Sequence, residues 1–111
     1  MEDFEDYIIK KPSIITEECE VMLREAASWT KENYNYPTQA EKMVKRFYKI
    51  VQVLETFPEI GTLCQNGMRK FPLGKFPYFI YYREKENEIE ILGIWHTSRG
   101  TAFEESTSSA P

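Results

Sequence analysis

The sequence predicts an α+β fold in which two antiparallel helices cover one face of a mainly antiparallel β-sheet. Residues 16–32 and 38–56 carry apolar side chains at helical spacing. Residues 67–99 are dense in aromatic and β-branched side chains and contain two turn-forming breaks, as a three-stranded meander does. Because each helix has a single apolar face, the pair is expected to pack together and onto one side of the sheet.

The first elements are a short strand and a helix. Tyr7–Lys10 is an apolar run stopped by Pro12, which predicts an N-terminal strand that joins the sheet. Thr16 offers a hydroxyl as N-cap of the first helix. Side chains of one helix face then recur at i, i+3, i+4 and i+7 until about Glu32, at Cys19, Met22, Leu23, Ala26 and either Trp29 or Thr30.

The second helix has the clearest apolar stripe in the chain. Thr38 and Glu41 have the spacing of a capping box, and Pro58 with Gly61 ends the helix near Thr56. Other faces carry four bases, which we interpret as a solvated face with a partner surface as the alternative: Lys42, Lys45, Arg46 and Lys49.

Three strands follow, at about Met68–Pro72, Pro77–Glu84 and Glu88–His96, and polar or glycine-containing turns separate them. Side chains of a strand alternate between its two faces. The aromatic side chains of the middle strand are interpreted as packing within the sheet, with base stacking as the alternative.

The face turned away from the helices is unusually apolar, particularly at Leu92 and Ile94, which simple alternation places together there. Since a helix pair covers only one face, this predicts a surface for a partner protein. Its expected contact residues also include Tyr81 and Arg83 of the middle strand.

The length of 111 residues fits one domain, expected over residues 1–103, and the Ser-rich end 104–111 is expected to be disordered. No apolar run is long enough to span a bilayer, and the acidic N-terminus lacks the features of a secretory signal. We therefore expect a cytoplasmic protein with no membrane partner.

The net charge of −4 argues against broad, non-specific nucleic-acid binding. Charge is uneven, however: residues 1–30 hold 8 acids and 3 bases, whereas residues 61–100 hold 4 acids and 6 bases. Cys19 and Cys64 are isolated and are expected to be small core residues. With one histidine and no paired cysteines, we expect no metal site and no cofactor.

One set of residues has a chemical interpretation, namely Arg69, His96 and Arg99. Two guanidinium groups could hold a phosphate while the imidazole transfers a proton, which is what metal-free RNA cleavage requires. The alternative is structural: Arg69 pairs with an acidic neighbour, and His96 bonds a backbone group at the end of its strand.

The ordered pattern from Tyr7 to Arg99 resembles the RelE/ParE toxin superfamily, and most closely its ParE branch. The resemblance is carried by the helix that closes on Leu54, Phe57-Pro58 and Gly61, and by the meander. In the meander the matching residues are Arg69-Lys70-Phe71, Gly74-Lys75-Phe76-Pro77-Tyr78, Ile80-Tyr81-Tyr82, Ile89-Glu90-Ile91-Leu92, His96 and Arg99.

The resemblance implies the toxin of a type II toxin–antitoxin (plasmid stabilization) module. A ParE-like toxin is expected to inhibit DNA gyrase by binding and to be neutralised by a cognate antitoxin, as a homodimer or as a heterotetramer with the antitoxin. A RelE-like toxin would instead be a ribosome-dependent mRNA endonuclease that uses Arg69, His96 and Arg99, although no tyrosine follows His96 here. A third possibility is a non-toxic binding module of the same fold.

Overall fold

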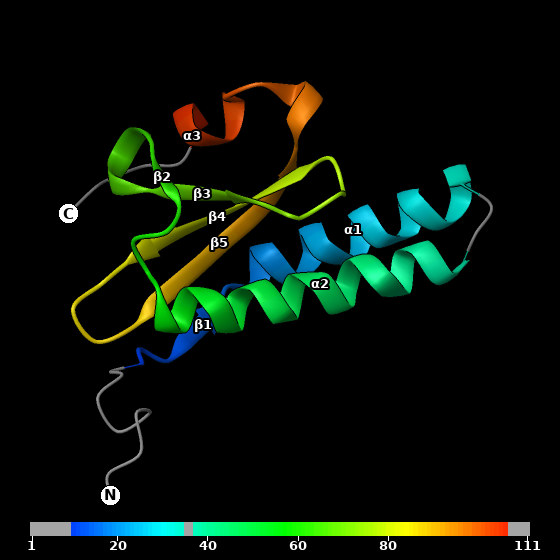
Figure 1. Ribbon diagram of the computed structural model, residues 1–111. Coiled ribbons are helices and arrows are strands. Elements are labelled where there is room, and N and C mark those ends of the chain that lie inside the picture. Colours follow the sequence, from blue (N-terminus) through cyan, green and yellow to red (C-terminus); the bar gives the residue numbers. More distant parts are fainter. Residues whose placement is uncertain (1–9, 35–36, 107–111) are drawn as a thin grey trace, which may run out of the picture.

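The computed structural model describes residues 10–34 and 37–106. Helices α1 and α2 lie on one side of a five-stranded sheet, and a short helix, α3, lies on the other (Figure 1). The strand order is β1-β5-β4-β3-β2. The elements are β1 (Ser13–Ile15), α1 (Glu17–Tyr34), α2 (Pro37–Thr56), β2 (Thr62–Leu63), β3 (Arg69–Pro72), β4 (Tyr78–Glu84), β5 (Ile89–His96) and α3 (Ala102–Ser106).

The predicted α+β arrangement, with a helix pair on one face of an antiparallel meander, is confirmed. Two 3-10 turns, Gln65–Gly67 and Thr97–Arg99, complete the described secondary structure. Strand β2, which pairs with β3 at the edge of the sheet, was not predicted because a two-residue strand carries no detectable alternation. None of the helices in the described ranges is long and apolar enough to cross a bilayer.

The N-terminal strand differs from the prediction. Most of the predicted run Tyr7–Lys10 lies outside the described residues, and Lys10 is not in a strand. Strand β1 begins instead after Pro12 and runs parallel to β5, with Ser13 opposite Ile89. The carbonyl of Pro12, which proline retains although it has no N–H, accepts the Ile89 N–H at 2.9 Å. Because parallel strands cannot be joined by a tight turn, a long connection is required, and here it comprises α1, α2 and the strands β2 to β4.

The helices start in different ways. Thr16 caps α1 as predicted, since its Oγ1 accepts the Cys19 N–H at 3.1 Å. The predicted capping box of the second helix is wrong, because α2 already begins at Pro37 and Thr38 lies inside its first turn. Proline suits that first position because its φ is fixed near the helical value and its missing N–H would have no partner there.

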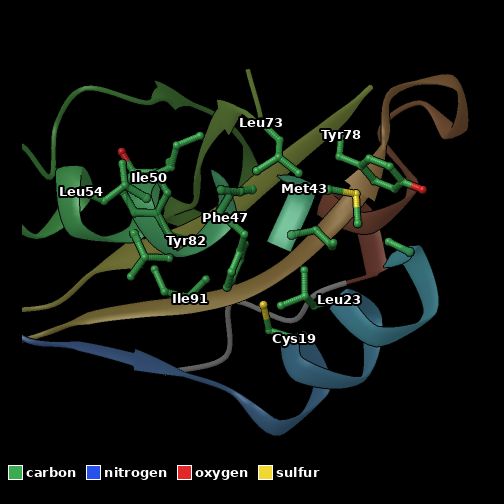
Figure 2. Packing of buried hydrophobic residues seen from close by; sticks show 14 of the residues in the cluster. Cys19, Leu23, Met43, Phe47, Ile50, Leu54, Leu73, Tyr78, Tyr82 and Ile91 are labelled. Carbon is green, nitrogen blue, oxygen red and sulfur yellow. The ribbon is translucent and has the colours of Figure 1, made fainter. Parts of the chain in front are cut away.

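The main core lies between the helix pair and the sheet (Figure 2). Met43, Phe47 and Leu54 of α2 are fully buried against it. Tyr82 of β4 is also fully buried, and its hydroxyl donates to the Pro58 carbonyl and accepts the Gly61 N–H, both at 2.8 Å. This side chain therefore ties the sheet to the loop that follows α2.

A β-bulge in β5 changes which side chains face the helices. Tyr81 pairs with Gly93 but the next residue, Tyr82, pairs with Ile91, so Leu92 is the extra residue. Since an extra residue reverses the alternation beyond it, Ile94 faces the helices and is only 3% exposed, whereas the half-buried Leu92 packs on the opposite side. The prediction that Leu92 and Ile94 share an outward face is therefore wrong.

The outward face of the sheet is partly covered by α3. Phe103 packs with Tyr81 and Met68 in a second buried cluster, and Glu104 is only 3% exposed. The prediction of a disordered end is wrong for residues 104–106, which belong to a helix, while residues 107–111 lie outside the described part of the chain. The apolar side chains of this face are therefore explained at least in part by their contact with α3.

Removing the chain after Gly100 is expected to destabilise the protein, because it strips Phe103 from Tyr81 and removes Glu104. Loss of one buried phenylalanine alone costs about 3–5 kcal/mol. Thermal unfolding followed by circular dichroism should show a melting temperature at least ~10 °C lower than that of the full chain. A chain ending at Ser106 is the control, and equal melting temperatures for both truncations would contradict the role of α3.

Candidate functional site

A cavity of about 460 Å³ opens where the C-terminal end of β5 meets α1. Its volume is in the range of small-ligand and side-chain pockets. The residues that line it are Met22, Glu25, Ala26, Trp29, Tyr78, Ile94, His96, Ser98 and Arg99. A second cavity of about 350 Å³ adjoins it and shares Trp29 and Tyr78, so the two form one hollowed surface.

His96 lies at the centre of an aromatic group. Its ring centroid is 5.0 Å from that of Tyr78 and 6.1 Å from that of Trp29, both in edge-to-face orientation. The β-bulge at Leu92 produces this placement, because it turns His96 to the same side as Ile94. Thr97 then anchors the strand end by donating its N–H to the Pro77 carbonyl at 2.9 Å.

The hydrogen bonds of His96 define its tautomer. Its Nδ1 accepts the Ser98 N–H at 3.1 Å and lies 2.7 Å from the Ser98 hydroxyl oxygen. Because a backbone N–H only donates, Nδ1 carries no proton in this arrangement, and the proton of the neutral ring is on Nε2. His96 thus bonds a backbone group at the end of its strand, as the structural alternative predicted.

Arg99 also lines the cavity, but its guanidinium lies over the ring of Trp95 at 3.7 Å from the centroid. This is a cation–π contact. Trp95 lies between Ile94 and His96 in the strand and packs with Phe103 on the outward side of the sheet. The Arg99 charge is therefore held at the rim of the cavity.

The structure does not bring Arg69 to this site. Arg69 pairs with Tyr82, whereas His96 pairs with Tyr78, four residues away along β4 or roughly 13 Å. The guanidinium of Arg69 donates to the carbonyls of Gly61 at 2.9 Å and Glu59 at 3.4 Å. Arg69 thus binds the loop after α2, and its predicted acidic partner is replaced by two carbonyl groups.

The predicted phosphate-binding set is therefore divided between two places. His96 and Arg99 share one cavity, and Arg69 lies near the other end of β4. The cavity offers one imidazole, one guanidinium at its rim and the carboxylate of Glu25. Such a set suits contact with a partner better than stabilisation of the charge on a phosphorane, which requires converging cations.

Six residues of the cavity were not predicted as site residues: Met22, Glu25, Ala26, Trp29, Tyr78 and Ser98. The buried stripe of α1 was expected to end at Trp29 or Thr30, and it ends at Thr30, which is 5% exposed, whereas Trp29 is 45% exposed. Met22, Glu25, Ala26 and Trp29 follow helical spacing and therefore share one face of α1, which was the available signal. That face of α1 meets the end of β5, and the bulge at Leu92 determines which β5 side chains point toward it.

Of the four predicted partner-binding residues, two are buried. Ile94 lies in the main core, and Tyr81 is 1% exposed beneath α3. Arg83 remains partly exposed and interacts with Glu90 at 3.6 Å and with the Asn66 carbonyl at 3.2 Å. Leu92 is half-buried beside the second cluster. Only Arg83 and Leu92 are therefore accessible for direct contact.

Tyr81 and Glu104 form a buried polar pair. The tyrosine hydroxyl donates to Glu104 Oε2 at 2.9 Å, and Lys70 Nζ lies 3.6 Å from the same oxygen. Burial alone would raise the pKa of Glu104, but the Tyr81 and Gln65 hydrogen bonds and the Lys70 charge together hold it below its usual value. Burial and the bond to Glu104 raise the pKa of Tyr81.

Neither cysteine has the properties of a nucleophile. Burial raises the pKa of Cys19 to about 12, with a smaller contribution from Glu20. Burial and then the charge of Glu104 raise the pKa of Cys64 to about 11. Both thiols are therefore protonated at neutral pH, and both are free. No group of three or more potential ligands for a metal ion occurs among residues 10–34 and 37–106.

Comparison with known proteins gives one family. The model of that family, described as the ParE toxin of the type II toxin–antitoxin system parDE, matches residues 14–100. Ten chains of solved structures match the fold. One, from the chromosomal ParDE toxin–antitoxin system of P. aeruginosa, is 22% identical with a TM-score of 0.66, covering 78% of this chain and 96% of that one. None of the curated proteins compared with the chain matches it.

Replacing Glu104 by Gln is expected to destabilise the protein near neutral pH by about 1–3 kcal/mol, since a buried charge-assisted bond is lost. Because the folded pKa of Glu104 lies below the unfolded value, its contribution is complete above the unfolded pKa of about 4.5 and is lost as the pH falls through the folded pKa. Urea unfolding of both proteins between pH 7 and pH 3 should show their free energies converging at low pH. An undiminished difference would contradict this assignment.

Proposed function

Because the chain belongs to the ParE toxin family of type II toxin–antitoxin systems, we propose that it stops growth by binding DNA gyrase in the cytoplasm until an antitoxin neutralises it. The resemblance to the ParE branch, noted from the sequence, is confirmed. The gyrase target and neutralisation by the antitoxin are the proposed part.

We prefer a binding mechanism to RNA cleavage because Arg69 lies apart from His96 and Arg99. Nuclease chemistry requires cations that converge on one phosphate together with groups that transfer protons. Here Arg69 is engaged by two carbonyl groups at the far end of β4, and Nδ1 of His96 is engaged by Ser98. A binding mechanism needs no such convergence and agrees with this geometry.

We place the target contact at the hollowed surface around His96. The surface has an exposed aromatic side chain, Trp29, which lines both cavities, and a guanidinium, Arg99, which lines the first. Partly exposed tryptophan and arginine are the residue types most often found to dominate the energetics of protein interfaces. An antitoxin segment that covers this surface would block the target by direct competition.

Expression of the chain alone is expected to stop growth, and co-expression with the antitoxin encoded beside it is expected to restore growth. In a purified assay the protein should inhibit supercoiling by DNA gyrase, because the proposed target is gyrase. A translation extract should show no mRNA cleavage. Harmless expression from a tightly controlled promoter, or ribosome-dependent cleavage lost on His96→Ala, would contradict the proposal.

Substitution of Trp29 and Arg99 by Ala is expected to weaken inhibition of supercoiling at least about tenfold, since interface anchors of these types contribute ~2 kcal/mol or more. Arg24→Ala on the exposed side of α1 is the matched control and should leave inhibition unchanged. Circular dichroism confirms that each variant is folded. Full inhibition by the folded double variant would show that the target binds elsewhere.

A further inference from the structure

Helix α2 carries a strip of basic side chains that form no ion pair with any other described residue. Four bases on and beside the sheet are in ion pairs: Lys11 with Glu84, Lys70 with Glu104, and Arg83 and Lys85 with Glu90. Four bases of α2 are all exposed and have no ion-pair partner among residues 10–34 and 37–106: Lys42, Lys45, Arg46 and Lys49. We call these four side chains the basic half of the strip.

Toward the C-terminal end of α2, the helix face that carries these bases becomes apolar. Val53 and Phe57 follow Lys49 and Arg46 at helical spacing, and the Phe57 N–H donates to the Val53 carbonyl at 2.8 Å, one residue beyond the helix end. We call the four exposed side chains of this surface the apolar half: Val53 at 37%, Phe57 at 58%, Ile60 at 48% and Leu63 at 62% exposure.

The apolar half has two features of a docking site. A hollow of about 560 Å³ lies among Thr56, Phe57, Pro58, Glu59 and Ile60. Next to it, β2 is an edge strand, and within residues 10–34 and 37–106 only β3 pairs with it, so no described strand occupies its other edge. Figure 1 shows the chain passing from the end of α2 directly to this edge.

We propose that this strip, the basic half followed by the apolar half, binds a segment of a partner protein that is acidic at one end and apolar at the other. The distance along the strip from Lys42 to Phe57 is about 22 Å, which a helix of about 15 residues spans. The proposal goes beyond the toxin function and holds whichever protein carries the segment.

Two other occupants fit less well. A nucleic acid would satisfy the bases, but its phosphate backbone gains nothing from four exposed apolar side chains, and the chain as a whole carries a charge of −4. A second copy would have to place its acidic α1 start, at Glu17, Glu18 and Glu20, on the basic half. Beside these acids, residues 17–28 expose one large apolar side chain, Val21, to meet the four of the apolar half.

The test is selection of random displayed peptides of about 15 residues on the full chain, followed by fluorescence anisotropy with the selected peptides. The selected peptides should combine Asp or Glu with large apolar residues. Lys45→Glu with Lys49→Glu should weaken their binding about tenfold or more, and so should Phe57→Ser, since each removes one kind of contact. Arg24→Glu with Lys31→Glu, which changes the charge equally on α1, should have no effect.

Several results would overturn the proposal. These are failure to enrich any peptide, enrichment of peptides without acids, and equal binding by the Lys45 and Lys49 variant when circular dichroism shows it folded. Tighter binding of a short DNA duplex that the same variant loses would assign the strip to nucleic acid. Self-association lost in that variant would assign it to a second copy. Because no outcome depends on growth or supercoiling, failure here is distinct from failure of the toxin proposal.

Discussion

The extra residue at Leu92 determines how both faces of this sheet are used. Up to Ile91, the strand β5 alternates so that Ile89 and Ile91 enter the core beneath the helices. Beyond the bulge the alternation reverses, which sends Ile94 and His96 to the helix side and Trp95 to the α3 side. Without this reversal His96 would lie on the outward face, and the cavity beside α1 would lack its central ring.

The same region leaves little space around the backbone of β5. A Cβ atom at Gly93 would approach Met22 Sδ to 2.7 Å and Phe103 Cζ to 2.9 Å, so α1 and α3 both reach the strand at this residue. Met22 accordingly packs against both hydrophobic clusters. Side chains of α1 and α3 thus both lie close to Gly93, the residue that follows the bulge.

Local sequence patterns predicted most of the fold but only part of the candidate site. Helical spacing and turn residues located α1, α2, β3, β4 and β5 because those signals are local. The bulge and the burial of Glu104 depend on contacts between distant residues, such as the bond from Tyr81, which no local pattern contains. The sequence therefore identified His96 and Arg99 but joined them to Arg69, which the register of β3 and β4 places elsewhere.

Solution NMR tests the reversal at Leu92 directly, because His96 is the only histidine in the chain and its ring protons can be assigned without ambiguity. We expect nuclear Overhauser effects from the His96 ring to the rings of Tyr78 and Trp29, whose centroids lie 5.0 Å and 6.1 Å away. Effects to Phe103, with none to Trp29, would show that His96 faces α3 and would contradict the account.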